Sequence, residues 1–131
     1  MIKRIVPRFK GGSRGGRMEP IYELHADLCK IFSNAKRLEI IDSLKDKEMS
    51  AGELIARIGL SKANLSQHMS VLKLKGVVLT RREGVNIYYR IANPKILQAC
   101  QLIREVLFEQ FQEKRKMVSG LRHTKRDVHL I

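Results

Sequence analysis

The 131-residue sequence is short of acidic residues, of cysteine and of long apolar runs. It has 13 acidic residues against 26 basic residues, which gives a formal net charge of +13. No apolar run resembles a signal peptide or a membrane span, so we expect a cytoplasmic protein without membrane association. The two cysteines, Cys29 and Cys100, should then be reduced thiols.

The residue sets of common enzymes are also missing. No nucleophile, base and orienting group form a set at a plausible cleft, and no glycine-rich phosphate loop follows a predicted strand. The serines lie where they would cap predicted helices or face a nucleic acid. We therefore expect neither catalysis nor a cofactor.

The positive charge is concentrated at the two ends of the chain. Residues 1–20 and residues 114–131 each hold six basic residues against one acidic residue, which leaves +3 for the rest. This distribution favours a polyanionic partner. We interpret residues 1–19 as a disordered basic arm and residues 121–131 as a basic tail, with one domain at residues 20–120. Met18 offers an alternative start for the functional chain.

Residues 50–76 have the pattern of two short helices joined by a tight turn. Ser50 and Glu53 form a capping-box signature at the start of the first helix. Gly59 is placed to end that helix, and Ser61 can cap the second one. Two short helices across a glycine-containing turn are typical of a helix-turn-helix.

The second of these helices has an apolar face and a polar face. Leu65, Met69 and Leu72 recur at spacings of four and three, so we expect them to pack inward. The other side chains are mostly amides, hydroxyls and a cation, which donate to and accept from base edges and phosphates. The residues that we expect to contact DNA from this helix are Lys62, Asn64, Ser66, Gln67, His68 and Ser70.

After this helix the pattern changes to β-strands. Branched and aromatic residues at 77–82 and 87–91 flank a turn that contains Gly84, which predicts a hairpin. A helix-turn-helix followed by a basic hairpin is a winged helix, so we expect a mainly α fold with one small hairpin. The hairpin residues that complete the predicted DNA-binding set are Arg81, Arg82 and Asn86.

Further helices are predicted on both sides of this module. Residues 20–32 have helical periodicity, and Ser33 can cap the helix that follows. After the hairpin, Pro94 suits the first turn of a last helix, which we expect to reach about residue 118 and to stop at Gly120. Its apolar stripe is longer than one domain needs, which predicts a partner helix. That stripe consists of Ile96, Cys100, Ile103, Leu107 and Phe111.

In order and spacing, these elements resemble the arsenic-repressor (ArsR/SmtB) family of dimeric winged-helix regulators. The resemblance covers about residues 20–110. It rests on residues 32–41, Leu60-Ser61, Leu65-Ser66-Gln67-His68-Met69, Leu72, Gly76-Val77-Val78, Arg81-Arg82-Glu83-Gly84 and Tyr88-Tyr89-Arg90-Ile91.

The resemblance implies a transcriptional repressor that binds a palindromic double-stranded DNA operator as a homodimer. It also implies that the first and last helices form the dimer interface. The alternative is a winged-helix protein without an inducer that binds RNA, or nucleic acid without sequence preference. The Gly/Arg composition of residues 11–17 suits that alternative.

The metal-ligand motifs of the family are absent from this sequence. One type of relative places a Cys-x-Cys pair where this chain has Ser50 and Gly52. Another type uses Asp and His ligands on the last helix. The matching positions here hold Asn93, Lys95, Val106 and Glu109, which cannot form an imidazole-rich site. We therefore expect no metal of those types.

Cys29 and Cys100 are the candidate residues for a redox switch. They fall on the first and last predicted helices, and some relatives use paired cysteines on such helices. In those relatives the first cysteine aligns near Asp42 instead of Cys29. The alternative interpretation is that both thiols fill core positions as small apolar side chains.

Overall fold

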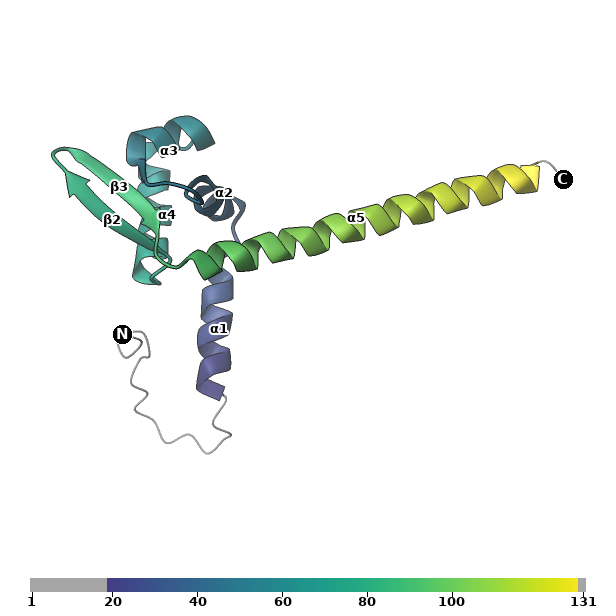
Figure 1. The fold of residues 1–131 in the computed structure, drawn as a ribbon, viewed down its shortest axis with the longest axis horizontal. Coiled ribbons are helices and arrows are strands. Elements are labelled where there is room, and N and C mark those ends of the chain that lie inside the picture. Colours follow the sequence, from purple (N-terminus) through teal and green to yellow (C-terminus); the bar gives the residue numbers. More distant parts are fainter. Residues whose placement is uncertain (1–18, 130–131) are drawn as a thin grey trace.

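The computed structural model describes the backbone of residues 19–129 and the side chains of residues 20–121. Of the predicted arm at residues 1–19, residues 1–18 lie outside the described residues, and Glu19 is the first residue of α1. The described chain is mainly helical with one small sheet (Figure 1), which confirms the predicted winged helix-turn-helix. In chain order its elements are α1 (Glu19–Ile31), α2 (Ala35–Ser43), β1 (Met49–Ser50), α3 (Ala51–Ile58), α4 (Lys62–Leu74), β2 (Val78–Glu83), β3 (Asn86–Ile91) and α5 (Pro94–His129).

The predicted caps of the helix-turn-helix are present. The backbone N–H of Glu53 donates to the Ser50 hydroxyl at 3.1 Å, and the Glu53 carboxylate accepts from the Ser50 backbone N–H at 3.3 Å. Gly59 follows α3 in the left-handed conformation with φ of 77°, where a side chain would be strained. The Ser61 hydroxyl accepts from the Asn64 N–H and starts α4.

The sheet has the strand order β1-β3-β2, with antiparallel pairing throughout. The predicted hairpin is formed by β2 and β3, and Gly84 takes φ of 61° in its turn. The two-residue strand β1 is an addition to the predicted elements. Met49 pairs with Tyr89 and Ser50 with Tyr88. A strand this short carries no alternation that a sequence pattern could reveal.

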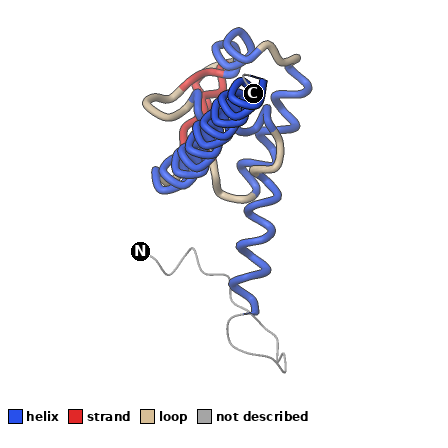
Figure 2. The backbone as a smooth tube through the Cα atoms, turned by 90° about the vertical axis from the view of Figure 1, so that its right-hand side faces the viewer, coloured by secondary structure: helices blue, strands red, loops and turns tan. Residues whose placement is uncertain are grey.

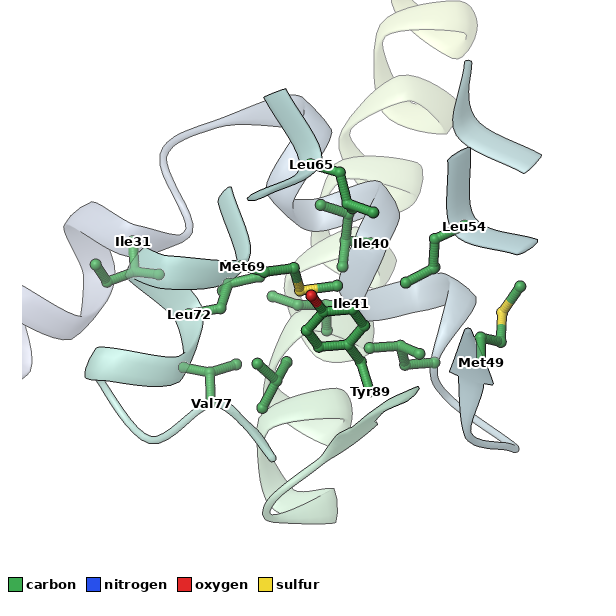
Figure 3. Packing of buried hydrophobic residues seen from close by; sticks show 12 residues of the cluster. Ile31, Ile40, Ile41, Met49, Leu54, Leu65, Met69, Leu72, Val77 and Tyr89 are labelled. Atoms are coloured by element: carbon green, nitrogen blue, oxygen red, sulfur yellow. The ribbon is translucent and has the colours of Figure 1, made fainter. Parts of the chain in front are cut away.

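The core lies where α2, α3, α4 and the sheet meet, and Figure 3 shows its side chains converging from these elements. Burying such side chains is the main term that stabilises a domain of this size. The predicted inward face of α4 is confirmed, since its three apolar residues are at most 2% exposed. The largest fully buried side chains are Ile40, Ile41, Leu54, Leu65, Leu72, Val77 and Val78.

Two helix boundaries differ from the sequence-based expectation. Asn34, not Ser33, caps α2, because its side chain accepts from the Arg37 N–H at 3.1 Å. The Ser33 hydroxyl instead donates to the Cys29 carbonyl and so serves the end of α1. At the other end, α5 continues through Gly120 to His129. A glycine inside a helix costs only about 1 kcal/mol, and the helix-forming residues around Gly120 offset it.

α1 and α5 both leave the compact part of the molecule, in different directions (Figures 1 and 2). Most of α5 has no other element against it, and its apolar side chains are exposed. Those more than 60% exposed are Leu102, Ile103, Phe108, Phe111, Met117 and Leu121. On α1, Tyr22 is 63% exposed. No helix among the described residues has the length and apolar character needed to cross a membrane.

Candidate nucleic-acid interface

The polar row of α4 faces solvent along one side of the helix. Its apolar face is anchored in the core, so the helix cannot rotate without exposing Leu65, Met69 and Leu72. The predicted DNA-contacting residues of α4 other than His68 are all exposed: Lys62, Asn64, Ser66, Gln67 and Ser70. This surface therefore presents amides, hydroxyls and a cation together, which suits hydrogen bonding to a groove of DNA.

His68 is placed differently from its neighbours on α4. It is half-buried, and burial together with the nearby positive charge of Arg37 lowers the pKa of its imidazole. Arg37 is itself held at the junction of α1 and α2, where its Nε donates to the Ile31 carbonyl at 2.6 Å. The imidazole therefore lies toward the body of the protein and is neutral at neutral pH.

The hairpin presents three predicted contact residues in two distinct environments. Arg82 and Asn86 are exposed, and no described side chain forms a hydrogen bond or ion pair with Arg82. Arg81 forms ion pairs of 2.6 Å with both Glu48 and Glu83. The tip of the turn is Val85, which is 98% exposed. An apolar tip contributes no charge of its own to a phosphate contact.

A polar notch of about 230 Å³ separates α4 from the hairpin. Its α4 side includes Ser66, Ser70 and Lys73, and its strand side includes Thr80 and Arg82. Lys73 and Thr80 were not in the predicted set. Helical spacing could have identified Lys73, because residues 66, 70 and 73 fall on one face of a helix. Cations and hydroxyls that meet at one notch suit a phosphate group.

The two cysteines do not form a common site in the protomer. Cys29 is exposed on α1, whereas Cys100 is buried on α5. Cys100 lines an apolar pocket of about 370 Å³ between α2 and α5, and Cys29 is not among the lining residues. Burial raises the pKa of the Cys100 thiol, and the charge of Arg104 opposes this rise. The thiolate, which is the reactive form, is therefore disfavoured at Cys100.

The same pocket contains the position at which the resemblance expected a cysteine. Asp42 lines it together with Cys100, and the Asp42 carboxylate accepts from the Arg104 guanidinium at 3.4 Å. At the position where some relatives have a cysteine, this chain therefore has Asp42, which forms an ion pair with Arg104. Within the described part of the chain, no group of three or more His, Cys, Asp or Glu side chains is arranged to hold a metal ion.

The helix-turn-helix also matches a known family of proteins. Residues 34–79 match the model of bacterial regulatory proteins of the arsR family. The HTH-type transcriptional regulator Rv0081 of Mycobacterium tuberculosis is 35% identical over 105 residues, which are 79% of this chain and 92% of the relative. The chain belongs to the ArsR family. It is therefore a DNA-binding transcriptional regulator and not an enzyme.

Other known proteins are similar to this chain in sequence or in fold. The biofilm growth-associated repressor of Agrobacterium fabrum is 40% identical over 86 residues, covering 66% of this chain and 70% of the relative. The crystal structure of Rv0081 superposes with a TM-score of 0.67 over 72% of this chain and 96% of that one. The homodimeric winged helix-turn-helix DNA-binding domain of Mb0332 from Mycobacterium bovis is 27% identical, with a TM-score of 0.68 over 79% of this chain and 95% of that one.

Proposed function

We propose that this ArsR-family regulator is a repressor that binds a palindromic operator as a homodimer. The observation that carries the proposal is the exposed polar row of α4, which the buried apolar face of the same helix holds in one orientation. The name of the Agrobacterium relative, a repressor, supports the direction of control.

In this proposal α4 lies in the major groove. Asn64 and Gln67 carry side-chain amides, which can each bond an adenine bidentately through its N6 and N7 atoms. Lys62, Ser66 and Ser70 add donors and acceptors for base edges or phosphates. The notch between α4 and the hairpin receives a backbone phosphate, with Lys73 and Arg82 as its cations.

The surfaces of α1 and α5 support the proposed homodimer. Both helices expose large apolar side chains that a monomer leaves in water, and the Mb0332 domain, of similar fold, is homodimeric. A two-fold axis between two copies presents two α4 helices to successive turns of DNA, about 34–36 Å apart. The operator should therefore consist of two inverted half-sites at that spacing.

The first experiment is a binding selection from random double-stranded DNA, with random single-stranded RNA as the competing pool. We expect recovery of inverted repeats from DNA. Gln67→Ala should lower affinity by about 1–3 kcal/mol at one base position of each half-site and relax the preference there. Gln98→Ala, a change of the same type at an exposed position of α5, is the matched control and should behave as wild type.

The outcome of this selection separates the proposal from its alternative. Recovery of RNA alone, or of DNA without a preferred site, would contradict it and favour a nucleic-acid-binding protein of low specificity. A reporter gene placed behind the selected site tests the direction of control. Repression should disappear with the Gln67→Ala variant, and activation by the wild-type protein would contradict the assignment as a repressor.

Thiol-based control is a second element of the proposal, and the exposure of Cys29 supports that residue as its reactive group. The exposed thiol of Cys29 reacts first with oxidant or polysulfide, since Cys100 is buried and its pKa is raised. We expect oxidant to weaken operator binding of the wild type and reductant to restore it. Cys29→Ser should abolish this response. An equal response in the wild type and in both Cys29→Ser and Cys100→Ser would remove the cysteines from the mechanism.

A further inference from the structure

Arg81 is the most heavily engaged side chain on the hairpin. Its Nη2 donates to Glu48 Oε1 at 2.6 Å, and its Nε lies 3.2 Å from both oxygens of the same carboxylate. Its Nη1 donates to Glu83 Oε2 at 2.6 Å. The guanidinium also lies over the ring of Tyr88, 4.5 Å from the ring centroid. One cation thus contacts two carboxylates and an aromatic face.

These contacts reach across all three strands of the sheet. Arg81 pairs with Tyr88 in the hairpin, and Tyr88 pairs on its other side with Ser50 of β1. The Arg81 side chain therefore passes over the middle strand to Glu48, which directly precedes β1. Ser50 ends β1 and caps α3. The ion pair consequently links the outer strand of the hairpin to the segment from which the helix-turn-helix starts.

The neighbouring Arg82 has the opposite surroundings. Side chains alternate between the two faces of a strand, so Arg82 and Thr80 share the face that lines the notch beside α4. Arg81 borders the notch as the residue between them, but its guanidinium lies on the other face, over Tyr88. Arg82 is exposed, and no ion pair among the described side chains engages it. Of the two adjacent arginines, Arg82 alone presents an uncompensated cation beside the polar row of α4.

Local charge argues against Arg81 as a phosphate ligand. A phosphate that approached its guanidinium would also approach the carboxylates of Glu48 and Glu83. Hydrogen bonding to Glu48 and Glu83 raises the pKa of Arg81, and the hydrogen bond from Arg81 lowers the pKa of Glu48. Arg81 and Glu48 are therefore charged at neutral pH, and the Arg81 guanidinium is paired with two carboxylates. The positive charge of Arg90 also acts on Glu48.

We propose that Arg81 is a positioning residue that braces the hairpin against the start of the helix-turn-helix, and that Arg82 makes the phosphate contact of the hairpin. This inference rests on the proposed reading of DNA by α4 and the hairpin. The ion pair between Arg81 and Glu48, called the brace below, sets the angle of the hairpin relative to α3 and α4. Arg82 and α4 can then contact the same DNA duplex.

Salt dependence of DNA binding distinguishes the two arginines. Arg81→Gln and Arg82→Gln remove the same charge from adjacent positions. Arg82→Gln should reduce the log–log salt slope by about 0.9 for each phosphate that it no longer neutralises, on both a selected operator and a random-sequence duplex of equal length. Arg81→Gln should leave the slope unchanged and weaken binding to the operator more than to the random duplex. Equal slope reductions in the two variants would overturn the proposal.

Hydrogen exchange in the protein without DNA tests the brace independently of the proposed function. Amides of β2 and β3 should exchange several-fold faster in Arg81→Gln than in the wild type. Glu48→Gln should accelerate the same amides, because it breaks the same ion pair from the other side. Arg82→Gln should leave them unchanged. If Arg81→Gln and Glu48→Gln retain wild-type exchange, the brace does not exist, whatever the DNA measurements give.

Discussion

Replacing Phe111 by serine should weaken dimerisation and leave the protomer folded. Phe111 is 66% exposed, and it belongs neither to the core cluster nor to the lining of the α2–α5 pocket. The protomer is therefore stabilised little by this ring. A second copy that covers α5 would bury the Phe111 ring. Removing the ring should therefore destabilise the dimer much more than the folded protomer.

The exposed fraction sets the expected magnitude. Full burial of a Phe side chain contributes about 1.5–3 kcal/mol, so the 66% that is still exposed corresponds to about 1–2 kcal/mol per protomer. A two-fold interface contains the residue twice, which gives about 2–4 kcal/mol of dimerisation free energy. The dimer Kd should then rise by about 30- to 900-fold.

Sedimentation velocity over a concentration series measures this Kd, and far-UV circular dichroism checks the helical content. Val85→Ser is the matched control, because Val85 is 98% exposed in the turn between β2 and β3. In Figure 1 this hairpin turn lies away from α1 and α5. The control should dimerise as the wild type does. An unchanged Kd in Phe111→Ser would refute the assignment of this part of α5 to the dimer interface.

Three further predictions concern the arm, a helix cap and a titrating side chain. Deleting residues 1–17 should lower the specific and the non-specific DNA affinity by similar factors. It should also reduce the log–log salt slope by about 0.9 for each phosphate that the arm neutralises. An unchanged slope would show that the arm does not contact DNA. Ser50→Ala should destabilise the fold by about 0.5–2 kcal/mol in urea unfolding, whereas Ser119→Ala on exposed α5 should not. Because the folded-state pKa of His68 lies below 6.5, its stabilising effect is complete above pH 6.5 and is lost as the pH falls through the folded pKa. The Tm of the wild type should therefore fall further on acidification than the Tm of His68→Gln, and parallel falls would contradict the burial of this imidazole.

The features that sequence patterns predicted are those decided within a few residues of the chain. The capping box of Ser50 and Glu53 spans three residues, and the left-handed Gly59 ends α3 within one turn. The inward face of α4 follows from helical spacing alone. The hairpin likewise needs only two alternating runs and the turn at Gly84. Such local rules suffice to predict the winged helix and its polar row without any tertiary contact.

The predicted helix ends were wrong where two alternatives have similar free energies. Ser33 and Asn34 are both good helix caps. In the structure Asn34 caps α2, whereas the Ser33 hydroxyl donates to the Cys29 carbonyl at the end of α1. Gly120 was expected to end α5, yet the helix continues because an interior glycine is only mildly unfavourable.

The two adjacent arginines of the hairpin show most clearly what the tertiary structure decided. In the sequence Arg81 and Arg82 are equivalent cations, and both were expected to contact DNA. Strand alternation directs them to opposite faces of the sheet. Only Arg81 then meets Glu48, a residue 33 positions earlier in the chain, because strand order β1-β3-β2 brings the start of the helix-turn-helix across from the hairpin. The sequence by itself determined the local elements and the excess of positive charge, whereas the long-range pairing of strands decided which of these charges stays uncompensated beside α4.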